Sequence, residues 1–140
     1  MINIRQELEV AKKASEIAAA LLIDNKDNIN KILSNEGRDV KLKADLESEK
    51  LIKEYLLANS NFPILAEESG ANQDLGNSFW VVDPLDGTSN YSRDFPMCCI
   101  SIALIYKKEI TLGVINDFNS DSTYEAVSYT HLTLPTILLV

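Results

Sequence analysis

The hydrophobic pattern of this chain changes its period once, near residue 60, and this change limits the folds open to it. Before that point apolar residues recur every three or four positions, which is typical of amphipathic helices. We expect a first helix over residues 2–22, with its apolar stripe at Ile4, Leu8, Ala11, Ala14, Ala18 and Leu21. We expect a second helix from Leu46 to Asn59, capped by Asp45, with its apolar stripe at Ile52, Tyr55 and Leu56.

After residue 60, short apolar segments bounded by turn residues predict β-strands. Phe79–Val82 is apolar on both faces, as a central buried strand must be. Residues 24–43 are polar and predict a loop with a short helical or extended piece. Helices followed by strands indicate an α/β (α+β) domain built in layers. The expected strands are Pro63–Ala66, Phe79–Val82, Cys98–Tyr106 and Ile110–Asn116.

Composition narrows the partners and the compartment. The 140 residues are 46% hydrophobic, which is enough for one domain with its own core. The net charge of -8 argues against a nucleic-acid or anionic-membrane surface, and no apolar run is long enough to span a bilayer. We therefore expect a cytoplasmic protein. Cys98 and Cys99 are adjacent and match no disulfide framework or zinc spacing, so we expect both to be reduced core residues.

The most informative stretch is the end of the predicted buried strand. There Asp83 and Asp86 flank a short turn, and Gly87 and Thr88 follow at once. Two neighbouring carboxylates repel each other unless a cation neutralises them, and Mg²⁺ takes oxygen ligands of this kind. A glycine lets the backbone approach an anion closely, and the amides after it can cradle a phosphate. The stretch predicts metal and phosphate chemistry.

Three other motifs fit this stretch poorly. An EF-hand loop aligned on Gly87 would require carboxylates at Val82, Pro84 and Arg93. A P-loop requires a lysine after the glycine. The dehalogenase-like phosphatases carry one residue between their two aspartates, whereas this chain has two. Two further acidic elements, Glu67-Glu68-Ser69 and Asp45, are by themselves typical of a solvated loop and a helix cap.

Three elements together resemble the inositol monophosphatase family. They are Leu42–Asp45, Ala66–Ser69 and Trp80–Tyr91, and the likeness continues to about Ala126. The resemblance implies a magnesium-dependent, lithium-sensitive phosphomonoesterase with an α/β/α/β/α sandwich. Residues 1–126 would form the N-terminal α/β portion of that domain.

The resemblance also implies a set of metal ligands. Glu67 and Asp83, with the backbone carbonyl of Leu85, would hold one Mg²⁺. Asp83 would bridge to a second ion that Asp86 also binds. A last metal-binding aspartate, in a Trp-Asp element, lies in family members downstream of the position matching residue 140.

The remaining site residues come from the same resemblance. Asp45 and Thr88 would orient the attacking water, so that Asp45, Glu67 and Thr88 are the catalytic residues. The amides of Gly87 and Thr88 would bind the phosphate, and Asp86 would lie against the substrate.

The motif also indicates the substrate class. Thr88–Tyr91, followed by Phe95-Pro96, resembles the inositol monophosphatase branch more than the bisphosphate nucleotidase branch, and fructose-1,6-bisphosphatases share the core motif. A small phosphorylated metabolite of the inositol phosphate class is the expected partner, and a homodimer is compatible with the family.

The last segment departs from this pattern. Residues 127–140 do not resemble the strand and glycine-rich turn of the family, so we expect this tail to be foreign to it and His131 to have no catalytic role. The alternative to an enzyme is a truncated fragment that binds metal or phosphate without turnover.

Overall fold

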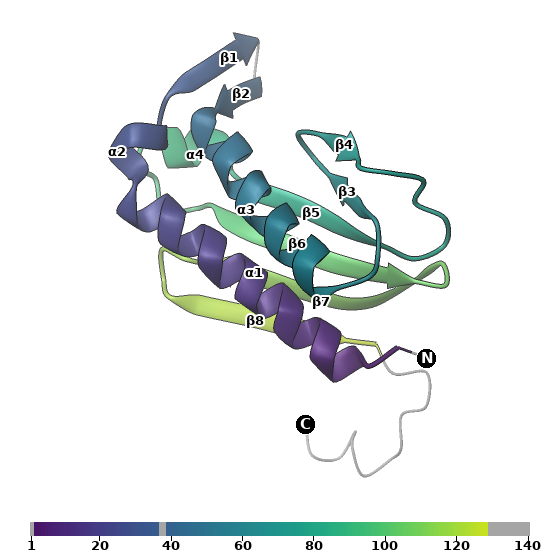
Figure 1. Ribbon diagram of the computed structural model, residues 1–140. Helices are drawn as coiled ribbons and strands as arrows, with labels where there is room; N and C mark the ends of the chain where they lie inside the picture. The colour runs from purple at the N-terminus through teal and green to yellow at the C-terminus, as the bar shows by residue number, and fades with distance from the viewer. Residues whose placement is uncertain (1, 37–38, 129–140) are drawn as a thin grey trace.

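The computed structural model describes residues 2–36 and 39–128 and has two layers, helices packed on a sheet. Figure 1 labels the elements in chain order. The elements are α1 (Ile4–Asp24), α2 (Lys26–Ile29), β1 (Ile32–Glu36), β2 (Asp39–Leu42), α3 (Lys43–Asn59), β3 (Ile64–Ala66), β4 (Gly70–Ala71), β5 (Phe79–Asp86), α4 (Thr88–Ser92), β6 (Cys99–Tyr106), β7 (Glu109–Asp117) and β8 (Ser122–Val127).

The main sheet has six strands in the order β4-β3-β5-β6-β7-β8. β3 and β5 run parallel, and the other neighbouring strands are antiparallel. β1 and β2 form a separate antiparallel hairpin. The parallel pair brings the carboxyl ends of β3 and β5 to the same edge of the sheet.

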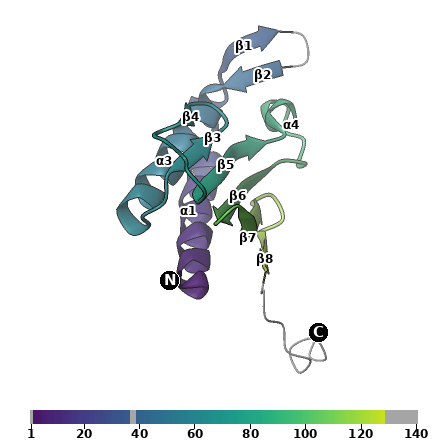
Figure 2. The same cartoon turned by 90° about the vertical axis from the view of Figure 1, so that its right-hand side faces the viewer.

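Both long helices cover one face of this sheet (Figures 1 and 2). α1 packs against β6 and β7, and α3 packs against α1 and β5. The predicted helical stripes are confirmed where they meet the sheet, since Ala11, Ala14, Ala18, Ile52 and Leu56 are fully buried. None of the helices in the described residues is both long and apolar enough to cross a bilayer.

All four predicted strands exist, and the structure corrects the view of β5 as buried on both faces. Trp80 and Val82 point into the helix-covered core and are buried, whereas Phe79 and Val81 are only partly buried. Their face of the sheet carries no helix from the described residues (Figure 2). The sheet therefore has one covered face and one open face in this part of the chain.

The start of α3 also differs from the prediction. The helix begins at Lys43 and its N-cap is Leu42, so Asp45 lies inside the first turn and is not the cap. The Asp45 carboxylate accepts a hydrogen bond from the Leu42 amide at 2.8 Å. A first-turn carboxylate satisfies a free amide at the helix start in this way when the N-cap residue has no polar side chain.

The polar segment 24–43 contains α2 and the β1–β2 hairpin, in agreement with a loop holding short regular pieces. β4, α4 and β8 were not predicted. Of the segment expected to be foreign to the family, Val127 ends β8 and Ser128 follows it, while residues 129–140, including His131, lie outside the described residues.

Candidate active site at the ends of β3 and β5

The last part of β5 is held in shape by α3. The ladder between β5 and β6 shifts register between Asp83 and Asp86, so the strand is irregular there before it ends at Asp86. Ser48 of α3 donates its hydroxyl hydrogen to the Pro84 carbonyl at 2.8 Å, and the Leu85 amide donates to Asp83 at 3.2 Å. Both contacts fix the direction in which the β5 carboxylates leave the strand.

Glu67 and Asp83 face each other across the parallel strands. Ala66 of β3 pairs with Val82 of β5, and the next residues along the chain are Glu67 and Asp83. The Glu67 amide donates to the Val82 carbonyl at 3.1 Å. The pKa of Glu67 is raised to about 8, first by its hydrogen bond with the Asp83 carboxyl, then by desolvation and by the charge of Asp83. Two carboxylates joined by a hydrogen bond must either share a proton or have a cation between them.

This pair suits a magnesium ion. Mg²⁺ is commonly held by one or two carboxylates, with waters and substrate phosphate oxygens completing its shell. Across residues 2–36 and 39–128, no group of three His, Cys, Asp or Glu side chains converges enough to hold a metal on its own. The Glu67–Asp83 pair therefore fits a metal whose remaining ligands are backbone, water or substrate oxygens. The pair borders a hollow of about 500 Å³ on the open face of the sheet.

Asp45 and Thr88 form the second half of the site. The Thr88 hydroxyl donates to Asp45 Oδ1 at 2.8 Å and lies 3.1 Å from the Leu85 carbonyl oxygen. Asp45 is 2% exposed, and this burial raises its pKa to about 6, against the opposing hydrogen bonds from Leu42 and Thr88. A buried carboxylate with a pKa near neutrality can accept and release a proton under physiological conditions.

Gly87 joins β5 to α4 in a conformation that few other residues adopt. Its φ is +88°, in the left-handed region, and it is the N-cap of α4. A Cβ at this position would lie 2.6 Å from the Met97 carbonyl oxygen. Both facts require glycine here.

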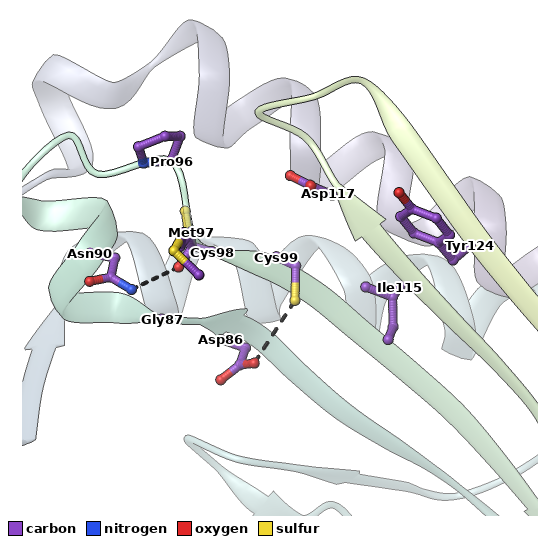
Figure 3. Close-up of a pocket in the computed structure, with 10 residues that line it drawn as sticks. All are labelled: Asp86, Gly87, Asn90, Pro96, Met97, Cys98, Cys99, Ile115, Asp117 and Tyr124. Carbon is purple, nitrogen blue, oxygen red and sulfur yellow. Dashed lines mark hydrogen bonds between the residues drawn. The ribbon is translucent and has the colours of Figure 1, made fainter.

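Asp86 lies at the border of another pocket, of about 600 Å³ (Figure 3). Its carboxylate lies 3.9 Å from the Cys99 sulfur, and the side chain is exposed. Asp117 lines the same pocket, and within the described part of the chain its buried Oδ1 has no hydrogen-bond partner. Asp86 therefore faces a pocket that also carries a thiol and a second carboxylate.

The two cysteines differ, which corrects the prediction that both are core residues. Both are free thiols, and Cys98 is buried, as predicted. Cys99, the first residue of β6, is only partly buried, and both cysteines line the pocket beside Asp86.

The structure thus brings together Asp45, Glu67, Asp83, Leu85 and Thr88, and it places Gly87 next to them. Sequence reasoning missed three residues that hold this arrangement: Lys41, Ser48 and Glu49. Glu49 is 4% exposed in a helix whose other buried positions are mostly apolar or small. A charged residue on the apolar stripe of a predicted helix is the signal that could have identified Glu49.

Comparisons with known proteins indicate the family of this chain. The inositol-1-monophosphatase of Synechocystis is 35% identical over 131 residues, which are 90% of this chain and 45% of that protein. A fructose-1,6-bisphosphatase/inositol-1-monophosphatase of Aquifex aeolicus is 34% identical over 120 residues, or 82% of this chain and 45% of that protein. The chain thus spans less than half the length of these two curated relatives.

Solved structures show the same likeness. The inositol monophosphatase of Anabaena superposes with a TM-score of 0.74 at 30% identity, over 90% of this chain and 45% of that one. The model of the inositol monophosphatase family matches residues 3–134. Because the family model covers most of the chain and the relatives are more than 30% identical, this chain belongs to the inositol monophosphatase family.

Proposed function

We propose that this chain carries the metal-binding and water-orienting residues of a magnesium-dependent phosphatase that hydrolyses phosphate monoesters of the inositol phosphate class. The observation that carries the proposal is the Glu67–Asp83 carboxylate pair beside the buried Asp45–Thr88 pair. The first arrangement suits a divalent cation and the second suits a water molecule. Membership of the family supports phosphate ester hydrolysis as the reaction that joins them.

Glu67, Asp83 and the Leu85 carbonyl would hold Mg²⁺, and Asp86 would add a ligand on the side of its own pocket. Mg²⁺ bound there would supply positive charge that lowers the pKa of a nucleophilic water and stabilises the departing alkoxide. The Leu85 carbonyl also lies 3.1 Å from the Thr88 hydroxyl, so the ligand set and the water-orienting pair share one backbone group.

Thr88 and Asp45 would hold the attacking water. Because the Thr88 hydroxyl donates its hydrogen to Asp45, its oxygen lone pairs are free to accept a hydrogen bond from water. Asp45 has a pKa of about 6 and is therefore mostly ionised at pH 7. It is able to draw a proton through Thr88 as the water attacks phosphorus.

Gly87 and Thr88 would bind the phosphate through their backbone amides. The amides in the first turn of a helix have no partner within the helix, and a negatively charged group is favoured there.

Phosphate release from inositol 1-phosphate tests the proposal, with the protein expressed from the whole gene that encodes this chain. Release is expected only with Mg²⁺, with Asp83→Asn and Thr88→Ala each lowering kcat at least about 100-fold. Glu54→Gln is the matched control, because it also removes one carboxylate but lies exposed on α3. Turnover that persists without Mg²⁺ or in Asp83→Asn would contradict the assignment.

Fructose 1,6-bisphosphate is the second candidate substrate, supported by the name of the Aquifex relative. The kcat/KM values for the two esters, measured with the same preparation, decide between them. Inhibition by millimolar Li⁺ is expected with either ester, and activity unaffected by Li⁺ would contradict that expectation.

A further inference from the structure

Lys41 is the cation that the structure places against the carboxylates of the site. Among the ion pairs between described residues, only one reaches the acidic groups at the ends of β3 and β5, the pair of Lys41 Nζ and Glu68 Oε2 at 2.7 Å. The pKa of Lys41 is raised first by its hydrogen bond with Glu68 and by the charge of Glu68, and then by the charges of Asp45 and Glu49. Lys41 therefore lies in a field set by carboxylates from two segments, α3 and the turn after β3.

Glu68 is held at both its side chain and its backbone. Its side chain is 9% exposed and pairs with Lys41, while its amide donates to Glu49 Oε1 at 2.8 Å. Glu49 is 4% exposed and belongs to α3. Glu68 directly follows Glu67, so these contacts also fix the backbone turn that carries the Glu67 carboxylate.

The neighbour of Lys41 reaches the other half of the site. The Leu42 amide donates to Asp45 Oδ2 at 2.8 Å, and Asp45 in turn accepts the hydrogen bond from Thr88. Lys41 and Leu42 are consecutive residues of β2. Lys41 thus contacts Glu68 in the turn after β3, and Leu42 contacts the Asp45 carboxylate. The β1–β2 hairpin is connected to the site through these two residues.

We propose that Lys41 is a positioning residue of the magnesium site, an inference that rests on the proposed function. Its ammonium group neutralises Glu68 and keeps that carboxylate turned away from the metal, so that Glu67 and Asp83 are the side chains that bind it. Without Lys41, Glu68 would be a largely buried charge with no counter-ion. It would then turn toward water or the metal and displace Glu67.

Simple electrostatics gives the opposite expectation, which makes the inference testable. A lysine near a cation site repels the cation, so its removal should strengthen Mg²⁺ binding if charge were its only effect. If Lys41 positions the ligands, its removal should weaken Mg²⁺ binding instead. The direction of the change therefore distinguishes the two roles.

The experiment is calorimetric titration of the full chain, free of metal, with Mg²⁺ as the only ligand. Lys41→Met is expected to raise the Kd about fivefold, the effect of losing one well-placed ion pair. Lys41→Arg is expected to restore binding to within about twofold, because the charge remains. Lys50→Met is the matched control, since Lys50 is exposed on the same helix as Glu49, and it is expected to leave the Kd within about twofold.

A double variant isolates the contact itself. If Lys41 acts through Glu68, the Lys41→Met change should have no further effect in a Glu68→Gln background. Circular dichroism of each metal-free variant checks that the fold is retained. If Lys41→Met does not fold, the Mg²⁺ affinities of the single variants Glu68→Gln and Lys41→Arg are measured in its place.

The outcomes separate the two proposals. A native protein that binds no Mg²⁺ overturns the proposed function and this inference with it. A native protein that binds Mg²⁺, with Lys41→Met binding equally or more tightly, overturns the positioning role alone. Loss of affinity in Lys41→Met that persists undiminished in the Glu68→Gln background also overturns it.

Discussion

Magnesium binding is expected to release a proton from the Glu67–Asp83 pair. Asp83 raises the pKa of Glu67 to about 8, so that at pH 7 the pair retains a shared proton in the metal-free protein. A divalent cation between the two carboxylates replaces this proton. A group with this pKa is about 0.9 protonated at pH 7 and about 0.1 protonated at pH 9, and these fractions are the expected numbers of protons released.

The assay is calorimetric titration with Mg²⁺ in two buffers of different ionisation enthalpy. The difference between the apparent binding enthalpies gives the number of protons released, measured at pH 7 and at pH 9. Glu54→Gln is the control for a change of one exposed carboxylate, and it should release the same number of protons as the native protein.

The origin of the proton is tested in the metal-free protein by carboxyl-carbon NMR. The titration midpoint of Glu67 is expected near 8 in the native chain and clearly lower in Asp83→Asn, where the charge of Asp83 is absent and only desolvation and the charges of Glu68 and Asp45 still raise the pKa. A native midpoint near the ordinary value of 4.5, or Mg²⁺ binding at pH 7 without proton release, would refute the reasoning.

Three further predictions concern stability. Gly87→Ala is expected to lower the free energy of unfolding in urea by about 2–4 kcal/mol, because alanine is strained at this positive φ and its Cβ would collide with the Met97 carbonyl oxygen. Gly76 also has a positive φ but open space around it, so Gly76→Ala should cost only about 1 kcal/mol. Equal losses in the two variants would contradict this account. Ser48→Ala is expected to cost about 1–2 kcal/mol, because the Pro84 carbonyl loses its hydrogen bond, and an unchanged urea midpoint would contradict it. The pKa values of about 6 for Asp45 and about 8 for Glu67 are raised, so both groups bind protons more tightly in the folded chain. Their contribution to stability is therefore full below about pH 4 and is lost as pH rises to about 8. In EDTA the Tm should be lower at pH 9 than at pH 5, and in excess Mg²⁺ this difference should be smaller. A Tm in EDTA that rises from pH 5 to pH 9 would contradict this prediction.

The sequence predicted the elements whose cause is local. The helical period placed Ala11 and Ile52 in the core, and the apolar run at Trp80 placed β5 inside the sheet. The site motif lies at the end of that strand, so Asp83 and Gly87 were found with it. Each of these follows from residues close together in the chain, where hydrophobic period and turn chemistry act.

The parts that were missed depend on contacts between distant segments. From local pattern alone Asp45 was expected to cap a helix, its pairing with Thr88 was implied only by the family resemblance, and the structure supplies the hydrogen bond between them. Lys41 lies in a polar segment with no apolar pattern, and nothing local links it to Glu68. Cys99 was assigned to the core because a uniformly apolar run does not show that one face of β6 is left open.

The parallel pairing of β3 with β5 has a consequence for how the chain reaches its native state. The register that pairs Ala66 with Val82 is the one that sets Glu67 beside Asp83. A slip of one residue would separate these charges but turn the apolar side chains of one strand to the wrong face. Above about pH 8, where the pair has lost its shared proton, core packing and charge repulsion therefore favour different alignments, and a divalent cation present during folding would remove the conflict. Refolding at pH 9 should accordingly be faster with Mg²⁺ than without it.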